Sequence, residues 1–370
     1  MKTAPIKLNA DFVFAGGVLH QDAGLQIENG VARLVPRQRG AIQLKGTISG
    51  GFVDLQVNGG GGVLFNNDPT PEGLLSIAEA HRTFGTTSIL PTVISDAPEV
   101  LKAAATAVLE NAGANGILGL HIEGPHIAMA RRGTHHPDFV RPMDDFTMSL
   151  VAQLRDAGHV VMITVAPEAC QNDQIAELVS IGAIVSIGHS DSDANTVADA
   201  IVAGATCGTH LFNAMSQMTA REPGVVGALL GSDAYAAMIC DGHHVDDAMI
   251  ALALRAHRRP ERLFLVSDAM ATVGGPDEFK LYGQTIRLQD GRLVNAEGNL
   301  AGAHVTQLEG LTRLVQNLQV PLQDALRMVT TVPASLIRRP LLGLIDGRRI
   351  EDLILLDDAM QMHALTDCLT

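Results

Sequence analysis

The sequence predicts an α/β protein, a (β/α)8 TIM-like barrel with a small β-sandwich-like domain built from both termini. Two observations lead to this prediction. Through the middle of the chain, short apolar runs alternate with longer helix-like segments, and apolar strands joined by helices are typical of a parallel sheet covered on both faces. At both ends this alternation stops, and short stretches separated by turn signals indicate a β-rich unit.

Each strand of the predicted barrel is a short apolar run. In chain order the runs span residues 52–58, 86–92, 117–123, 161–166, 183–189, 206–211, 235–241 and 262–268. Helix-like segments such as 97–112 and 193–204 lie between them. Eight such units favour a closed barrel, and an open doubly wound sheet is the alternative that the alternation leaves open.

The change of pattern at the two ends of the chain sets the expected domain limits. We assign residues 1–50 and 342–370 to the small β domain and residues 51–341 to the barrel. Residues 320–338 are expected to form the last barrel helices. Pro333 is expected to mark a break there, because proline cannot continue the hydrogen-bond pattern of a helix.

The composition is that of a globular enzyme with a sizeable core, since 46% of the 370 residues are hydrophobic and 18% are charged. The formal net charge of -14 argues against a nucleic-acid partner, because no basic stripe can neutralise phosphates. The four cysteines form no CxxC pair, which favours a reducing compartment. We read neither a signal peptide nor an apolar run long enough to cross a membrane, so a cytoplasmic protein is expected.

Polar side chains stand at the ends of five predicted strands, where barrel enzymes place their active sites. They are Gln56 and Asn58, Glu123, His189, His210 and Asp268. Any one of them alone is as well explained by a hydrogen bond at a strand end. Two imidazoles and a carboxylate at one mouth are nevertheless a ligand set for a catalytic metal with an open position for water. The recurrence over several strands favours that metal site.

Asp268 is expected to act as a base. A metal lowers the pKa of a water molecule towards about 7, and a nearby carboxylate can take its proton and deliver it to a leaving amine. The alternative for Asp268 is a helix N-cap after the last strand.

A series of motifs runs in order from about Gly51 to about Gly310. They read GFVDLQVNGGGGVLFN, HIEGPHI, RRGTHHPDFV, TVAPE, GHSDS, THLFNAMSQMTAREPG, CDGHHVD and VSDAM. Together they resemble the N-acetylglucosamine-6-phosphate deacetylase family of the amidohydrolase superfamily. The resemblance implies metal-dependent hydrolysis of N-acetyl-D-glucosamine 6-phosphate to D-glucosamine 6-phosphate and acetate, in amino-sugar catabolism.

The resemblance also implies a role for each catalytic position. Glu123, His189 and His210 match the ligands of the catalytic metal. Asp268 matches the general base that later acts as the acid. His135 matches the histidine that holds and polarises the substrate carbonyl.

Four further positions match residues that bind the substrate. Arg221 and His244 match phosphate ligands, and an arginine fork with a histidine suits a phosphate dianion on chemical grounds as well. A surface ion pair near Glu222 is the alternative for Arg221. Asn213 and Ala214 match a loop that contacts the phosphate or the sugar.

The first strand indicates how many metals to expect. Many amidohydrolases have an HxH pair there, whereas Gln56 and Asn58 are amides and poor zinc ligands. We therefore expect one divalent metal per subunit. Zinc suits a site of two histidines and one glutamate, with Fe²⁺, Co²⁺ and Mn²⁺ as alternatives.

The remaining histidines are interpreted as bystanders. His121 lies two residues before Glu123 on the same side of the strand, where it packs in the barrel or orients that carboxylate. Solvated positions are expected for His20, His81, His159, His257 and His363.

The resemblance implies a homodimer in which phosphate ligands come from the neighbouring subunit. Two rival functions stay open. One is an amidohydrolase for a different N-acylated amino sugar or a cyclic amide. The other is a catalytically inactive regulator that binds a sugar phosphate.

Overall fold

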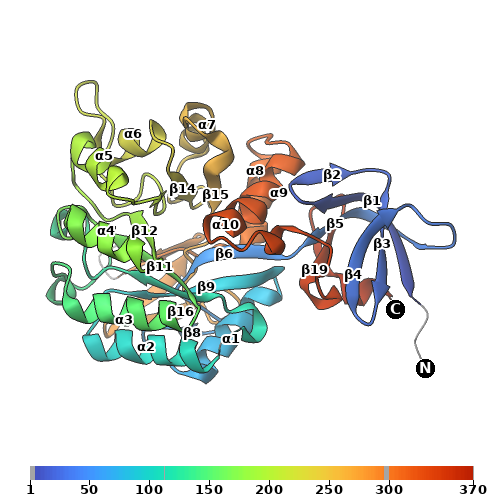
Figure 1. Cartoon of the computed structure of the whole chain (residues 1–370), viewed down its shortest axis with the longest axis horizontal. Coiled ribbons are helices and arrows are strands. Elements are labelled where there is room, and N and C mark those ends of the chain that lie inside the picture. The colour runs from blue at the N-terminus through green and yellow to red at the C-terminus, as the bar shows by residue number, and fades with distance from the viewer. Residues whose placement is uncertain (1–4, 112, 296–299, 370) are drawn as a thin grey trace.

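The computed structural model describes residues 5–111, 113–295 and 300–369, and it contains the predicted parallel barrel (Figure 1). The barrel sheet has eight parallel strands in chain order. They are β6 (Phe52–Val57), β9 (Thr86–Ile94), β10 (Gly119–Glu123), β11 (Val160–Val165), β12 (Ile184–Ile187), β13 (Cys207–Gly208), β14 (Tyr235–Met238) and β15 (Leu263–Leu265). Each lies on one of the predicted apolar runs, so the barrel prediction is confirmed.

The sheet closes because the chain beyond β15 returns to β6. Val57 and Ala269 form a parallel bridge. The Asp268 amide donates to Gln56 O at 3.0 Å, and the Asn58 amide donates to Ala269 O at 2.9 Å. Closure at this seam brings the ends of the first and last strands together, which an open sheet would not do.

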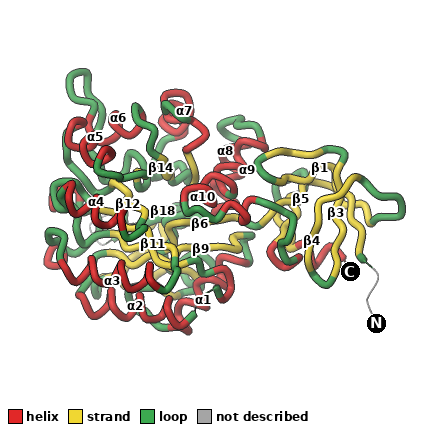
Figure 2. The backbone as a smooth tube through the Cα atoms, in the orientation of Figure 1, coloured by secondary structure: helices red, strands yellow, loops and turns green. Residues whose placement is uncertain are grey.

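Helices surround the barrel sheet, as Figure 2 shows in red. They are α1 (Pro71–Arg82), α2 (Pro98–Glu110), α3 (Asp145–Asp156), α4 (Asn172–Ser180), α5 (Ala194–Val202), α6 (Gly224–Leu230), α7 (Asp247–Ala256), α8 (Gln307–Gln316), α9 (Leu322–Val329) and α10 (Thr331–Leu336). The side chains of Asp144 and Asp193 cap α3 and α5 by accepting backbone N–H groups. The break between α9 and α10 falls at Thr330 and not at the predicted Pro333. Pro333 lies in the first turn of α10, where its missing N–H costs no bond.

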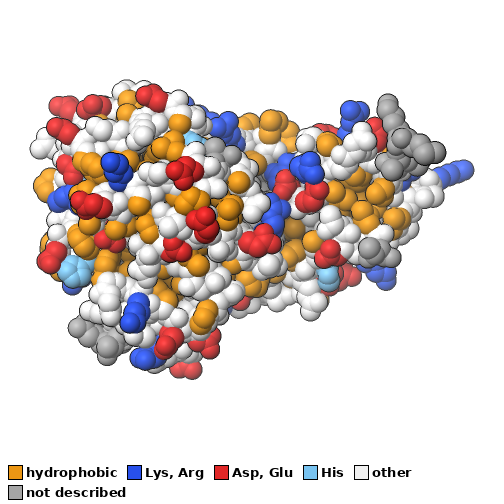
Figure 3. Space-filling view, turned by 90° about the horizontal axis from the view of Figure 1, so that it is seen from below, with side chains coloured by type: hydrophobic (Ala, Val, Ile, Leu, Met, Phe, Trp, Pro, Cys, Tyr) orange, Lys and Arg blue, Asp and Glu red, His pale blue; other side chains and the backbone are white. Residues whose placement is uncertain are grey.

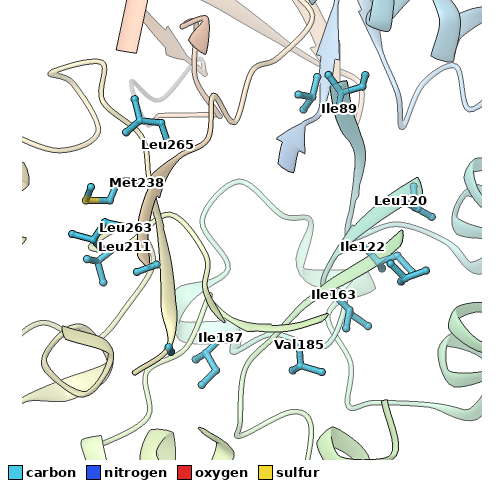
Figure 4. Close-up of a cluster of buried hydrophobic side chains, with 14 of the residues drawn as sticks. Ile89, Leu120, Ile122, Ile163, Val185, Ile187, Leu211, Met238, Leu263 and Leu265 are labelled. Carbon is cyan, nitrogen blue, oxygen red and sulfur yellow. The ribbon is translucent and has the colours of Figure 1, made fainter. Parts of the chain in front are cut away.

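The main core lies between the sheet and the helices. Figure 4 shows buried side chains of this layer, among them Ile122, Ile163 and Val185 from three neighbouring strands. A second apolar cluster, which includes Leu55, Leu90, Met162 and Phe264, comes from the alternate positions of the strands. The alternation explains why the strands read as almost continuous apolar runs, since both of their faces are covered.

The β-rich unit is one seven-stranded sheet drawn from both ends of the chain. Its strands are β1 (Ile6–Ala15), β2 (Val18–His20), β3 (Ala23–Glu28), β4 (Val31–Pro36), β5 (Ile42–Gly50), β19 (Leu353–Leu356) and β20 (Met362–Ala364). The two ends join where β5 pairs antiparallel with β19, Gly50 opposite Leu353. A separate β-rich domain is therefore confirmed, and the limits 1–50 and 342–370 stay a prediction.

One element had no counterpart in the prediction. A three-stranded meander of β16 (Glu278–Leu281), β17 (Gln284–Gln289) and β18 (Arg292–Val294) follows the last barrel strand. Both of its turns use residues with positive φ, Tyr282–Gly283 and Asp290–Gly291. A smaller two-stranded pair, β7 (Gly59–Gly60) and β8 (Val63–Leu64), follows β6.

Three of the histidines expected to be solvated are buried instead, namely His81, His159 and His257. His81 Nε2 lies 2.9 Å from Gly59 O, and its burial lowers the pKa of the imidazole. The helical pattern of α1 did not reveal that this position faces the barrel. Among the described residues, no helix is long and apolar enough to cross a membrane.

Candidate metal centre and active site

Three of the predicted residues converge at the C-terminal mouth of the barrel. Glu123 ends β10, His189 follows β12 and His210 follows β13. Glu123 Oε1 lies 3.2 Å from His189 Nε2 and 3.0 Å from His210 Nε2, and the two Nε2 atoms are 3.1 Å apart. All three side chains are buried, and their ligand atoms form a group that could hold a metal ion.

The hydrogen bonds of this cluster suit a cation. His189 Nδ1 lies 2.8 Å from Arg131 O, and because a carbonyl oxygen only accepts, Nδ1 carries the proton. In the neutral ring of His189 the lone pair is therefore on Nε2, which faces the centre of the cluster, whereas in the charged ring Nε2 donates to Glu123 Oε1. Burial works against ionisation of Glu123, yet the bonds with His189 and His210 hold its pKa well below the ordinary value. An anionic oxygen beside two imidazole nitrogens fits a divalent metal.

The backbone of these residues is strained. His189, His210 and Asp268 have φ values of 48°, 32° and 51°, in the left-handed region that residues with side chains rarely adopt. Such conformations persist only where the surrounding structure enforces them, and they gather at functional sites. Each of the three lies in the turn that follows a barrel strand, and this turn directs its side chain into the mouth.

The two amides of the first strand hold carboxylates. Gln56 Nε2 donates to Glu123 Oε1 at 3.1 Å and to Asp268 Oδ1 at 3.0 Å. Asn58 Nδ2 donates to the same Asp268 oxygen at 2.7 Å. Burial, with the neighbouring Glu123 carboxylate adding to it, raises the pKa of Asp268 to about 6. A carboxylate in this range can both take and return a proton near neutral pH.

His135 adds a hydrogen-bond donor to the site. The Ser95 amide donates to His135 Nδ1 at 3.3 Å, and Ser95 Oγ lies 2.7 Å from the same atom. Because a backbone amide only donates, Nδ1 is the acceptor and Nε2 carries the proton. Burial lowers the pKa of His135 to about 3, so the ring is neutral. Its ring lies 4.5 Å from that of His189.

The substrate-binding residues are only partly brought together. Asn213, Ala214 and His244 line one cavity of about 170 Å³. The three candidate metal ligands (together called the metal cluster), His135 and Asp268 line the same cavity. His244 Nδ1 lies 2.6 Å from Asp241 Oδ2, which fixes its orientation. Arg221, in contrast, is exposed and is not among the residues that line this cavity.

Sequence reasoning missed the residues that support the site from behind. Glu168 accepts hydrogen bonds from the Ser190 and Ser192 hydroxyls and from the Asp191 amide. It thereby ties down the loop that follows His189. The signal was a carboxylate directly after the fourth strand, in TVAPE. Ser95, which orients His135, had no comparable signal, whereas Asp241, which orients His244, ends the predicted run 235–241 and was not singled out.

His121 lies below the metal cluster, inside the barrel. Its Nδ1 is 3.0 Å from Leu55 O and its Nε2 is 2.8 Å from Thr164 Oγ1. The hydroxyls of Thr164, Thr209 and Ser186 continue this chain of hydrogen bonds across the neighbouring strands. Burial lowers the pKa of His121 to about 4. The ring is therefore a neutral member of a polar layer beneath the ligands.

Comparison with known proteins identifies the family to which this chain is similar. The profile of the Amidohydrolase family matches residues 47–368. The chain is 43% identical to the N-acetylgalactosamine-6-phosphate deacetylase of Shewanella sp. (strain ANA-3), over 86% of this chain and 82% of that protein. It is 37% identical to the N-acetylglucosamine-6-phosphate deacetylase of Haemophilus influenzae, over 80% and 78% of the two chains.

Solved structures give the same result at the level of the fold. The N-acetylglucosamine-6-phosphate deacetylase of Pasteurella multocida superposes with a TM-score of 0.89 at 31% identity, covering 97% of both chains. A mutant of the Mycobacterium smegmatis enzyme in complex with N-acetyl-D-glucosamine-6-phosphate superposes with a TM-score of 0.88 at 31% identity, again over 97% of both chains. The similarity includes the β-rich unit as well as the barrel.

Proposed function

This chain belongs to the amidohydrolase family, and we propose that it hydrolyses N-acetyl-D-glucosamine 6-phosphate to D-glucosamine 6-phosphate and acetate. The observation that carries the proposal is one cavity that combines a ligand set for a metal, a carboxylate of raised pKa and a neutral histidine donor. Relatives with this activity cover most of the chain at 31% identity or more.

Glu123, His189 and His210 would hold one divalent metal per subunit. Such an ion, when bound, acidifies a water molecule and polarises a carbonyl group. We propose zinc, because two histidines and one glutamate form a set that zinc commonly uses, with Fe²⁺, Co²⁺ and Mn²⁺ as alternatives. Metal analysis of the purified protein distinguishes among them.

The proton transfers are assigned to Asp268. Its Oδ1 already accepts from Gln56 and Asn58, which leaves Oδ2 to take a proton from the attacking water. The same oxygen then returns the proton to the departing amine nitrogen, as acid catalysis of amide cleavage requires. The two amides act as positioning residues in this scheme.

His135 is assigned to the substrate carbonyl. Its neutral ring donates through Nε2, so it stabilises the oxygen as negative charge develops during attack. The Ser95 amide keeps Nδ1 as the acceptor and thereby keeps the proton on Nε2. His244, held by Asp241, is assigned to the phosphate at the other end of the substrate, with Asn213 and Ala214 beside it.

We propose that Arg221 completes the phosphate site of a second subunit in a cytoplasmic homodimer. Its side chain is exposed and lies outside the cavity of its own chain, whereas an arginine fork is suited to a phosphate dianion. In such a dimer, Arg221 of each subunit would contact the substrate phosphate in the cavity of the other subunit. Sedimentation of the purified protein tests the oligomeric state.

A second candidate substrate is N-acetyl-D-galactosamine 6-phosphate. It is favoured by the relative of 43% identity whose name carries that activity. The two sugars differ only in configuration at C4, which is remote from the amide, so the chemistry assigned above is unchanged. The groups that contact the C4 hydroxyl decide between them.

Acetate release from the metal-loaded enzyme tests these proposals. We expect turnover of at least one of the two phosphorylated sugars and a much lower kcat/KM for unphosphorylated N-acetylglucosamine. A preference for the galacto epimer would replace the substrate and retain the mechanism. Absence of turnover with both phosphorylated sugars would instead favour the inactive regulator, and turnover without a phosphate preference would favour another N-acylated sugar or a cyclic amide.

A further inference from the structure

A second cavity lies at the opposite end of the barrel from the metal cluster. It has a volume of about 430 Å³ and is bordered by the first residues of three strands, Val160, Ile184 and Tyr235. Because the catalytic residues stand at the C-terminal ends of the strands, the two cavities are separated by the length of the barrel. Nothing in the proposed deacetylation uses this second cavity.

Three arginines line this cavity, which we call the basal cavity. Arg155 comes from the last turn of α3, and Arg338 and Arg339 follow α10. The described residues that line it include no aspartate or glutamate. A concentration of positive charge is unexpected in a chain whose formal net charge is -14. Figure 3 shows acidic and basic side chains interspersed over one face of the molecule.

The guanidinium groups retain unused donors. Arg155 donates to His159 O, and Arg339 Nη2 donates to Gly158 O at 3.2 Å. Arg155 Nε is shielded from solvent and has no hydrogen-bond partner in the described structure. Arg338 makes no ion pair with any described residue.

Capping of α3 accounts for only part of this arrangement. A cation near the C-terminal end of a helix is favourable, and Arg155 is placed for that role. One capping residue would be enough, however, and Arg338 and Arg339 belong to another segment. Two guanidinium groups, those of Arg155 and Arg339, bind the adjacent carbonyls of Gly158 and His159, so like charges are brought close together. A bound anion would relieve their repulsion.

The other residues that line the basal cavity indicate the chemistry of the part of the ligand that is not anionic. Apolar side chains such as Val161 and Leu336 alternate with the hydroxyl-bearing residues Thr206, Ser335 and Tyr235. We propose that the basal cavity binds a small phosphate monoester, its phosphate held by the three arginines and its body against the mixed wall. Arginine forks match the geometry and charge of a phosphate dianion.

The absence of tryptophan from the chain provides a local probe. Ser335 is exposed on the rim of the basal cavity, so Ser335→Trp places the only tryptophan of the variant there. Selective excitation of tryptophan then reports on ligands in the basal cavity and not on ligands at the distant catalytic mouth. Inorganic phosphate and glucose 6-phosphate are titrated separately, with potassium chloride at equal ionic strength as the reference. We expect a saturable change in emission with glucose 6-phosphate, tighter than with inorganic phosphate, and no saturable change with chloride.

The arginines are tested in the same background. Arg338→Met/Arg339→Met should raise the Kd for glucose 6-phosphate at least tenfold, because two charge-assisted contacts are lost. The matched control is Arg33→Met/Arg39→Met, which removes two exposed arginines of the β-rich unit and should leave the Kd unchanged. Equal Kd values in the two double variants would overturn the proposal, as would a signal with inorganic phosphate alone.

A second measurement guards against blockage of the cavity by the new indole. Titration calorimetry with glucose 6-phosphate on the protein with native Ser335 should show a binding event that the Arg338→Met/Arg339→Met variant lacks and the Arg33→Met/Arg39→Met variant keeps, whereas heat from the catalytic cavity is common to both variants. The proposal is wrong if Ser335→Trp shows no saturable change in fluorescence and the protein with native Ser335 shows no basal-cavity binding by calorimetry. The outcome is independent of whether the chain is a deacetylase, because any binding at the catalytic cavity is the same in the two double variants and cancels in their comparison.

Discussion

At the scale of single residues, hydrogen bonds to the backbone set which ring nitrogen carries the proton in two histidines of the catalytic cavity. Arg131 O keeps the proton of His189 on Nδ1, and the Ser95 amide keeps that of His135 on Nε2. The first imidazole is thereby prepared to bind a cation, and the second to donate to an oxygen. The two imidazoles, with ring centroids 4.5 Å apart, therefore have opposite roles, one as a metal ligand and one as a hydrogen-bond donor, because their backbone partners differ.

The metal ligands give the first prediction. His189→Ala or His210→Ala removes one of three ligand side chains, so metal content and activity should fall together. Glu123→Gln should do the same because the anionic oxygen is lost. Metal content is measured by elemental analysis alongside acetate release, with His363→Ala, an exposed histidine, as the control. Full metal occupancy and normal turnover in His189→Ala would show that His189 is not a metal ligand.

The base gives the second prediction. Asp268→Asn keeps the shape and the hydrogen bonds of the side chain but cannot accept a proton, so kcat should fall by about 10²-fold or more. Metal content should stay near that of the native protein. Near-normal kcat would transfer the base role elsewhere, with His135 as the next candidate.

Residues with a signal in the sequence were those that interrupt an apolar run. Glu123, His189, His210 and Asp268 each end such a run, and all four meet in the structure. Ser95 also follows a strand, but a serine there is common in any fold. The burial of His81 was missed because a helical pattern does not state which neighbour covers a given face.

At the scale of elements, the loops that follow the strands are held by contacts between neighbouring loops. Glu168 follows β11 and binds residues 190–192, which follow β12. Arg131, in the loop after β10, pairs with Asp191 at 2.7 Å. The strained backbone of His189 is therefore enclosed by contacts from two other loops.

Glu168 gives the third prediction. Glu168→Ala releases the loop beyond His189 without touching the metal ligands, so metal affinity should fall about tenfold or more, as is usual for partners that orient a ligand. A competing chelator measures that affinity. Glu177→Ala, an exposed carboxylate on α4, is the matched control, and identical affinities in the two variants would exclude the positioning role.

Asp54 gives the fourth prediction, on β6. It is buried and accepts the Ser267 amide at 3.2 Å, and burial raises its pKa from 3.8 to about 7. The folded state thus binds the proton more tightly than the unfolded state. The associated stability is fully present below pH 4 and is lost as the pH rises towards 7.

Asp54→Asn removes this titration while keeping an acceptor for the Ser267 amide. The Tm of the variant should therefore fall less between pH 5 and pH 8 than that of the native protein. Thermal denaturation followed by circular dichroism at several pH values provides the comparison. Parallel curves for the two proteins would show that Asp54 is not the group that titrates.

The meander of β16, β17 and β18 shows what was missed at this scale. Its two turns, Tyr282–Gly283 and Asp290–Gly291, have the positive φ values that tight hairpins need. Asp-Gly between alternating stretches is a hairpin signal, and it was overlooked because the expected rhythm was strand and helix. Strands of the barrel were easier to predict, since both faces are covered and the apolar signal is continuous.

At the scale of the whole molecule, the assignment of Arg221 to a second subunit can be tested by mixing inactive variants, and this gives the fifth prediction. Asp268→Asn lacks the base, and Arg221→Ala lacks the proposed shared contact. In a mixed dimer, the Arg221→Ala subunit keeps its own Asp268 and receives an intact Arg221 from its neighbour. Mixing after reversible dissociation should therefore restore kcat/KM on the phosphorylated sugar.

Each mixed dimer should reach about half of the activity of a native dimer, because one of its two sites is complete. If Arg221 served its own chain, both sites of a mixed dimer would stay defective. The control mixes Asp268→Asn with His189→Ala, two changes within one cavity, and this pair should not complement.

The overall architecture was predictable because it depends on a repeated pattern. Each barrel unit repeats the same signal, so an error in one strand leaves the whole interpretation intact. The seam between Val57 and Ala269 and the pairing of β5 with β19 join segments far apart in sequence. Such contacts leave no local signal, and only the matching β character of the two ends suggested the second.

The β5–β19 pairing also sets an order of events during synthesis. Strands β1 to β5 leave the ribosome first, but β5 stays without that neighbour until residues 353–356 emerge. The whole barrel is translated in the meantime, so the unit nearest the start of the chain is the last to be completed. An exposed strand edge is prone to pair with other chains. Nascent chains that stall within the barrel should therefore aggregate through β5, and a chaperone that covers this edge would protect them.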